Sequence, residues 1–200
     1  MPKPRPERPN SRRENSKSKL DWLEVAYAAA VEGGITAVAI SPLAKRLGVT
    51  HGSFYWHFAD QAALLKELIE RWYSYERSTV QRLSEIHNGE PRDDLREILQ
   101  NALGDMSSER VRFELALRDL GRRDPEVAHM LVQVDAERTQ LFARQFTRID
   151  PDTAQDRAVL LYLALVGAFN ALWRSNTSKT FQRHLMDVIQ RLAIDATTSP

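Results

Sequence analysis

Length, composition and charge already exclude several classes of protein. The 200 residues allow one or two domains with a core of useful size. The chain has no cysteine, which excludes a disulfide framework and thiolate metal sites. The net charge of +1 hides an asymmetry, because residues 1–61 carry nine basic and six acidic side chains whereas the remainder is neutral to acidic. A basic N-terminal part on an otherwise neutral to acidic chain favours a polyanionic partner for that part. Positively charged tails can also simply aid solubility.

The first part of the chain predicts a tail followed by a helix. Residues 1–17 are rich in proline, arginine and serine and lack apolar periodicity, so we expect a disordered basic tail rather than a signal peptide. Such a tail either lies along phosphates or is inert. Residues 19–32 then show apolar side chains at spacings of three and four, and Gly33 and Gly34 end the predicted helix.

Residues 41–58 predict two short helices around a tight turn. Ser41 is the expected N-cap of the first helix, because Pro42 follows at the first helical position, where its missing N–H costs nothing. Gly48 is expected to supply the left-handed residue that ends this helix. Thr50 is the expected cap of the second helix.

The second short helix has two different sides. Phe54 and Phe58, four residues apart, are expected to anchor one side to the core. The other side presents Gly52, Ser53, Tyr55 and Trp56, with His51 at the N-terminal end. Small residues let a backbone come close to a partner, and flat side chains with polar tips suit a helix that enters a DNA major groove. The same aromatic residues could instead form a packed cluster in an ordinary all-α protein.

This stretch closely resembles the helix-turn-helix of the TetR-type transcriptional regulators. Their pattern is Ala-x-x-x-Gly-Val-[Ser/Thr]-x-[Gly/Pro]-[Ser/Thr]-[Leu/Phe]-Tyr-x-His-Phe, complete here as Ala44, Gly48, Val49, Thr50, Gly52, Ser53, Phe54, Tyr55, His57 and Phe58. The resemblance covers residues 20–70 by motif and the remainder by helix layout. One departure from the family pattern is Gln61. The family commonly has a lysine at this position that reaches a phosphate, whereas the neutral amide of glutamine lacks the positive charge.

The remaining chain predicts further helices, and no segment alternates convincingly with the period of a strand. We expect helices over residues 60–86, 93–103, 108–120, 125–149, 152–174 and 178–194. Asp60, Ser108 and Asp124 are the expected N-caps of three of them, and Asp152 is expected to open another. The fold class is therefore all-α. By resemblance, residues 18–65 form a three-helix DNA-binding domain, and residues 66–200 form a larger helical domain for effector binding and dimerisation.

Residues 158–173 are apolar nearly all round, unlike an amphipathic surface helix. The run is too short for a membrane helix of about 20 residues and contains Asn170, so we expect a soluble, cytoplasmic protein. Either a second molecule covers its outer side, or its own neighbours surround it. The resemblance implies a homodimer through the last two helices, with two recognition helices ~34 Å apart on a palindrome.

The sequence gives no sign of catalysis, of a cofactor or of a metal site. The five histidines are scattered without metal-ligand spacing, and phosphate-binding glycine loops are missing. Glu109, Glu114, Asp119 and Asp135 are interpreted as solvated faces rather than catalytic acids. We therefore do not expect an enzyme.

The resemblance implies a DNA-binding regulator, usually a repressor, that a small effector releases from its operator. Base-edge contacts are expected from Thr50, His51, Gly52 and Ser53, and phosphate contacts from Lys45, Tyr55, Trp56 and His57. Residues on helices that could line an effector cavity are Trp72, Tyr75, Met106, Phe113, Leu117, Met130, Val134, Phe142 and Phe169. Ordinary core packing is the more frequent role of such residues. None of these residues is charged, which favours an apolar or aromatic effector.

Two other functions fit the same residues. One is a constitutive DNA-binding dimer without an effector, which a cavity filled by side chains would favour. The other is a protein-interaction module in which the aromatic helix recognises a partner protein. A steep loss of affinity with rising salt separates DNA binding from the second alternative.

Overall fold

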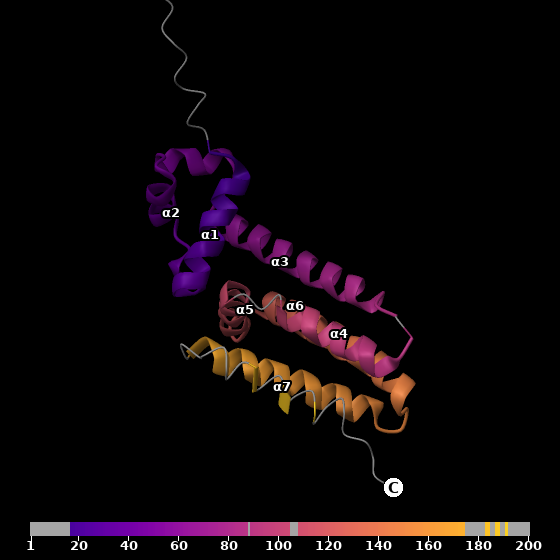
Figure 1. Ribbon diagram of the computed structural model, residues 1–200. Helices are drawn as coiled ribbons and strands as arrows, with labels where there is room; N and C mark the ends of the chain where they lie inside the picture. Colours follow the sequence, from indigo (N-terminus) through magenta and orange to yellow (C-terminus); the bar gives the residue numbers. More distant parts are fainter. Residues whose placement is uncertain are drawn as a thin grey trace, which may run out of the picture. The chain divides into compact units, whose positions relative to one another are not determined.

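The computed structural model describes residues 17–87, 89–104 and 108–174, together with residues 183, 184, 187, 188 and 191. Over these residues the fold is helical and contains no strand, as predicted. The elements are α1 (Lys19–Gly33), η1 (Ile35–Ala37), α2 (Ile40–Leu47), η2 (His51–Trp56), α3 (Gln61–Ser84), α4 (Pro91–Gly104), α5 (Ser108–Gly121), α6 (Pro125–Ile149) and α7 (Ala154–Arg174) (Figure 1). The chain divides into two compact units, Met1–Leu68 and Ile69–Pro200.

Helix α1 begins and ends as local chemistry dictates. The hydroxyl of Ser18 accepts from the backbone N–H of Asp21 at 3.2 Å, and the Asp21 carboxylate accepts from the backbone N–H of Ser18 at 2.6 Å. This capping box satisfies N–H groups that have no partner within the helix. The chain leaves the helix at Gly34, whose φ of 76° favours glycine. The predicted helix is confirmed, although the sequence analysis had not identified its cap.

Helix α2 begins one residue before the predicted cap, so the assignment of Ser41 as N-cap is wrong. The first turn is set by the backbone N–H of Leu43, which donates to the carbonyl of Ala39 at 3.1 Å. Ser41 therefore lies inside the first turn. Pro42 is tolerated there because first-turn N–H groups lack a helical partner in any case. Gly48 ends the helix in the left-handed region with a φ of 68°, as predicted.

The second short helix, η2, is a 3₁₀ helix. Its backbone bonds join residues three apart, as in the bond from the N–H of Ser53 to the carbonyl of Thr50 at 3.0 Å. Thr50 occupies the N-cap position, but its side chain makes no capping hydrogen bond. The expected side-chain cap is therefore wrong, and the carbonyl of Thr50 is what starts the helix.

Helix α3 starts at the predicted cap and contains the boundary between the two units. The Asp60 carboxylate accepts from the backbone N–H of Ala63 at 2.8 Å. The unit boundary falls between Leu68 and Ile69, inside the helix. The apolar residues of α3 that are buried are Leu64, Leu68, Ile69, Val80 and Leu83. Trp72 is only half-buried.

The core of the second unit lies among α4, α6 and α7, with a contribution from the end of α3. Its fully buried members include Leu95, Ile98, Leu99, Phe146, Ala158 and Leu161. Helices α6 and α7 pack along each other, joined by a turn around Asp150. Asp150, rather than the predicted Asp152, supports the start of α7, because its carboxylate accepts from the hydroxyl of Thr153 at 2.6 Å and from the N–H of Asp152 at 3.2 Å.

The start of α6 offers a test of the capping argument. One carboxylate oxygen of Asp124 accepts from the N–H groups of Glu126 at 3.0 Å and Val127 at 3.2 Å. We expect Asp124→Ala to lower the free energy of unfolding by about 1 kcal/mol, because two N–H groups lose their acceptor. Urea unfolding followed by circular dichroism measures this. Asp119→Ala, which removes an exposed ion pair with Arg123, is the control and should cost no more than about 0.5 kcal/mol. Equal losses in both variants contradict the capping argument.

Several sequence predictions lie outside the described residues. They are the tail of residues 1–16, Met106 and most of the helix predicted over residues 178–194; the side chain of Phe169 also lies outside them. Among the helices that the structure does describe, none combines the length and apolarity that crossing a bilayer requires.

Candidate functional site

The exposed side of η2 carries two large aromatic residues. Phe54 is fully buried, with its ring 5.2 Å from that of Trp22 and 5.4 Å from that of Phe58. This packing anchors η2 on its apolar side, as predicted. Tyr55 is 55% exposed and Trp56 is 87% exposed. Both side chains are thus open to solvent, whereas Phe54 of the same helix is not.

The remaining predicted contact residues lie around these aromatic side chains, with one exception. Thr50, His51 and Gly52 are exposed, and the His51 ring lies edge-on to Tyr55 at 5.7 Å between centroids. His57 is half-buried. The hydroxyl of Ser53 is instead buried without a hydrogen-bond partner and does not face outward.

Two neighbouring basic residues on α2 differ in their surroundings. Arg46 donates to the carboxylate of Glu32 at 2.6 Å, and this hydrogen bond lowers the pKa of Glu32. The ion pair ties the end of α2 to the end of α1. Lys45, the predicted phosphate contact, is exposed on the same helix. Gln61, the departure from the family pattern, is the exposed first residue of α3.

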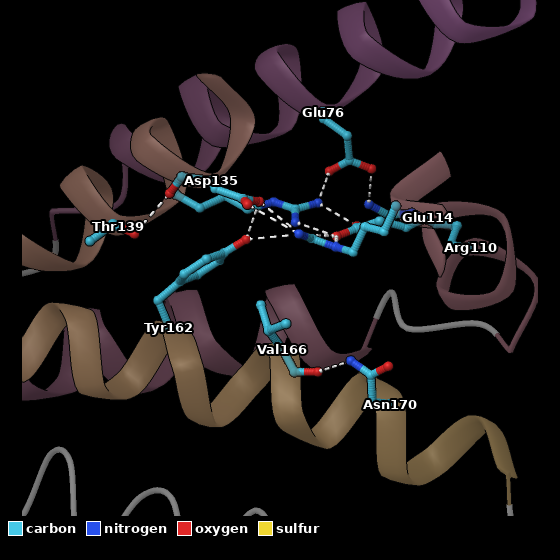
Figure 2. Close-up of polar contacts among 10 residues, drawn as sticks. Glu76, Arg110, Glu114, Asp135, Thr139, Tyr162, Val166 and Asn170 are labelled. Carbon is cyan, nitrogen blue, oxygen red and sulfur yellow. Dashed lines mark hydrogen bonds and ion pairs between the residues drawn. The ribbon is translucent and has the colours of Figure 1, made fainter. Parts of the chain in front are cut away.

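The second unit contains a buried ion network that was not predicted from the sequence. Glu76 of α3 is 3% exposed and Glu114 of α5 is 7% exposed. Arg138 of α6 joins them, donating to Glu76 at 2.7 Å and to Glu114 at 2.9 Å. Figure 2 shows the side chains of Glu76 and Glu114 within this network. The interpretation of Glu114 as a solvated face is therefore wrong, because its carboxylate is buried and accepts hydrogen bonds from Arg138.

The network continues along α5 to α6 and α7. Arg118 donates to Glu114 and to Asp135, each at 2.7 Å, and to the hydroxyl of Tyr162 at 3.1 Å. Tyr162 in turn donates to Asp135. Asp135 is thus only partly exposed and engaged by two side chains, so its interpretation as a solvated face is also wrong.

Charge balance keeps the network ionised. Burial alone would raise the pKa of Glu114, but the guanidinium groups of Arg138 and Arg118 lower it further than burial raises it, and it lies below its ordinary value. Burial opposes the charge of Arg118 and Arg138, yet the carboxylates raise the pKa of both. Burial raises the pKa of Tyr162 to about 12, so its hydroxyl stays a donor. The network therefore remains intact across the neutral range.

The described residues among those proposed for an effector cavity differ in their burial. Phe113, Leu117, Val134 and Phe142 are buried, and Phe142 belongs to the core among α4, α6 and α7. Trp72 and Met130 are half-buried, and Tyr75 is 45% exposed. A groove of about 610 Å³ does lie between α3 and α6, but its lining is mostly polar and contains none of the predicted residues: Tyr73, Ser74, Arg77, Ser78, Val80, Gln81, Ser84, Glu137, Gln140 and Arg144.

Comparison with known proteins agrees with the helix-turn-helix geometry. Residues 23–68 match the model of the bacterial regulatory proteins, tetR family. The chain carries a TetR-family N-terminal domain. The HTH-type transcriptional regulator AcrR of Shigella flexneri is 28% identical over 140 residues, which are 70% of this chain and 64% of that protein. The chain thus spans less than two thirds of the length of this relative.

Solved structures share the fold beyond the TetR-family domain. A transcriptional regulator from Rhodococcus sp. Rha1 superposes with a TM-score of 0.72 at 18% identity, covering 92% of this chain and 100% of that one. The reduced form of E. coli NemR gives a TM-score of 0.64 at 17% identity, covering 92% of this chain and 99% of that one. An N-terminal helix-turn-helix followed by a larger helical region is therefore the architecture of the part of the chain that the structure describes.

Proposed function

We propose that this chain is a DNA-binding transcriptional regulator, acting as a repressor, that binds a palindromic operator as a homodimer. The observation that carries the proposal is the outward presentation of Tyr55 and Trp56 on the second helix of a TetR-family helix-turn-helix. Thr50, His51, Gly52 and Ser53 would contact base edges, with a rotation of the Ser53 hydroxyl out of its buried position. Lys45, Tyr55, Trp56 and His57 would hold the phosphate backbone.

A second copy of the chain would cover α7. Its apolar side chains Val159, Leu160 and Leu163 are 40%, 60% and 61% exposed. These residues lie within two turns of the helix, and Gly167 follows one turn after Leu163. A Cβ atom added at Gly167 would meet open space. Such an apolar stripe favours association, and a two-fold dimer would present two copies of η2 to a palindrome. Leu160→Glu together with Leu163→Glu should convert the dimer to a monomer in sedimentation.

A small effector with an apolar or aromatic body would release the operator, and the protein would need no catalytic step. Effector and operator would then oppose each other by a coupling of about 1–3 kcal/mol. The second candidate is a constitutive DNA-binding dimer, which the complete burial of Phe113 and Leu117 favours because these residues already fill the core. A thermal-shift screen of small aromatic compounds distinguishes the two, since a ligand of the folded state raises its melting temperature.

Selection of bound sequences from a random duplex pool tests the proposed function. We expect enrichment of a palindromic site, with an affinity that falls steeply as the salt concentration rises. Indifference to every duplex at low ionic strength contradicts the proposal. If the chain instead binds a protein partner with an affinity that does not depend on salt, the result supports a protein-interaction module.

A further inference from the structure

We propose that the effector carries a carboxylate, which takes Arg110 and Arg138 away from Glu76 and thereby loosens α3. The inference rests on the proposed function, for which it names the chemical class of the effector. It concerns the second unit, where Glu76 is the member of the ion network that belongs to α3 (Figure 2).

Glu76 is held from both sides by different helices. Arg110 of α5 donates to one of its carboxylate oxygens at 2.9 Å, and Arg138 of α6 donates to the other at 2.7 Å. The Glu76 side chain is only 4% exposed. A carboxylate in such a position is stable only while its cationic partners stay in place. The attachment of this part of α3 therefore depends on the two arginines.

The accessible end of this cluster favours an anion. The Arg110 side chain is 27% exposed, whereas the Glu76 side chain with which it pairs is only 4% exposed. The guanidinium of Arg110 lies 4.9 Å from the centre of the Tyr75 ring, and Tyr75 is itself 45% exposed. A charged molecule arriving from solvent thus meets a guanidinium beside an aromatic face. An aromatic acid fits both features, with its carboxylate on Arg110 and its ring beside Tyr75.

A second, independent observation lies one turn further along α3. Thr79 is 8% exposed, and its hydroxyl is buried without a hydrogen-bond partner. Residues three apart share a helix face, so Thr79 and Glu76 face the same side. A buried polar group without a partner is unfavourable, and a carboxylate oxygen would accept a hydrogen bond from this hydroxyl. Arg110 and Thr79 together offer donors suited to an organic acid.

Exchanging one carboxylate for another explains how binding would act on α3. The network keeps its charge balance when a ligand carboxylate replaces that of Glu76 on the arginines. Glu76 would then be buried without its partners, which is strongly unfavourable, so α3 must shift to return it to water. Helix α3 begins at Gln61, within the first unit. The helix that shifts therefore also supplies the last residues of the TetR-family domain.

The test pairs aromatic acids with their neutral amides, without DNA. Benzoate, phenylacetate and 1-naphthoate are compared with benzamide, phenylacetamide and 1-naphthamide by thermal melting of the full chain. At a hundred times its dissociation constant an acid should raise the melting temperature by about 5 °C, and its amide should not. Hydrogen exchange of the α3 amides near Glu76 should become faster in the acid-saturated protein. The proposal is overturned if no acid shifts the melting temperature, if amides act equally, or if α3 exchange slows.

Two variants separate competition at this cluster from general stabilisation. Glu76→Gln removes the competing carboxylate, so the acid should bind about tenfold more tightly, equivalent to about 1.4 kcal/mol. Arg110→Met should abolish the shift, whereas Arg122→Met, at an exposed arginine, should retain it. If Arg110→Met does not fold, Glu76→Gln decides, and unchanged or weaker acid binding overturns the proposal. Because no DNA is present, failure to bind a duplex would count against the proposed function alone.

Discussion

Replacing Gly52 with leucine is expected to weaken binding of the selected duplex by about 100-fold, or ~2.8 kcal/mol at 1.4 kcal/mol per factor of ten. Gly52 lies on the exposed side of η2. A Cβ atom at this position would meet only the Thr50 hydroxyl oxygen, at 3.9 Å, which is ordinary contact. The protein therefore has room for a larger side chain, and leucine has the better helix propensity. If this side of η2 enters the major groove, the added side chain collides with the base edges.

Fluorescence anisotropy with the selected duplex measures this effect, and thermal melting shows whether the variant is folded. Gln100→Leu is the matched control, because it adds an apolar side chain at an exposed position of α4 in the second unit. The control should bind like the unmodified protein. Unchanged affinity of a folded Gly52→Leu variant would show that this side of η2 does not approach DNA.

The sequence predicted well the elements whose cause is local. Gly48 ends α2 because its backbone must adopt a left-handed conformation, and Asp60 and Asp124 begin helices because their carboxylates accept nearby N–H groups. Each cause lies within four residues of its effect. The prediction of Ser41 as an N-cap was wrong because a backbone hydrogen bond to the carbonyl of Ala39 starts the helix earlier. Side-chain preferences carry no information about that backbone bond.

The ion network could not be predicted from local patterns, because its partners lie far apart along the chain. Arg138 is 62 positions from Glu76 and 24 from Glu114. One signal was nevertheless present. Arg110, Glu114 and Arg118 recur every four residues and so share a helix face with the apolar Phe113 and Leu117. Charged residues on the apolar face of a helix are buried and paired, whereas a solvated stripe would lie on the opposite face.

The outward face of η2 was predicted because the anchoring positions of Phe54 and Phe58 fix which side is buried. Once Phe54 packs against Trp22 and Phe58 packs against Phe54, helical geometry leaves Tyr55 and Trp56 exposed. The direction of the Ser53 hydroxyl was beyond such reasoning, since it depends on the rotamer and not on the helix face. Residue patterns thus predict faces of helices, and the structure adds the orientation of individual polar groups.

Replacing Arg138 with methionine should lower the free energy of unfolding by about 3 kcal/mol. Arg138 is 16% exposed and is the residue that neutralises both buried glutamates. Methionine fills similar space but leaves Glu76 with Arg110 alone and Glu114 with Arg118 alone. Urea unfolding monitored by circular dichroism measures the loss. Arg144→Met, at an exposed arginine of α6, should change the free energy by no more than about 0.5 kcal/mol.

A triple variant and a pH series show whether charge is the cause. Glu76→Gln and Glu114→Gln combined with Arg138→Met leave no buried carboxylate without its partner, so more than half of the lost stability should return. The pKa of Glu114 lies below its ordinary value of 4.5 because Arg138 and Arg118 outweigh burial. Its stabilisation is therefore complete above that pH and is lost as the pH falls through the lower pKa of the folded state. The difference between the unmodified protein and Arg138→Met should accordingly narrow below pH 4.5; a difference that is constant with pH would mean that methionine packs badly and that charge plays no part.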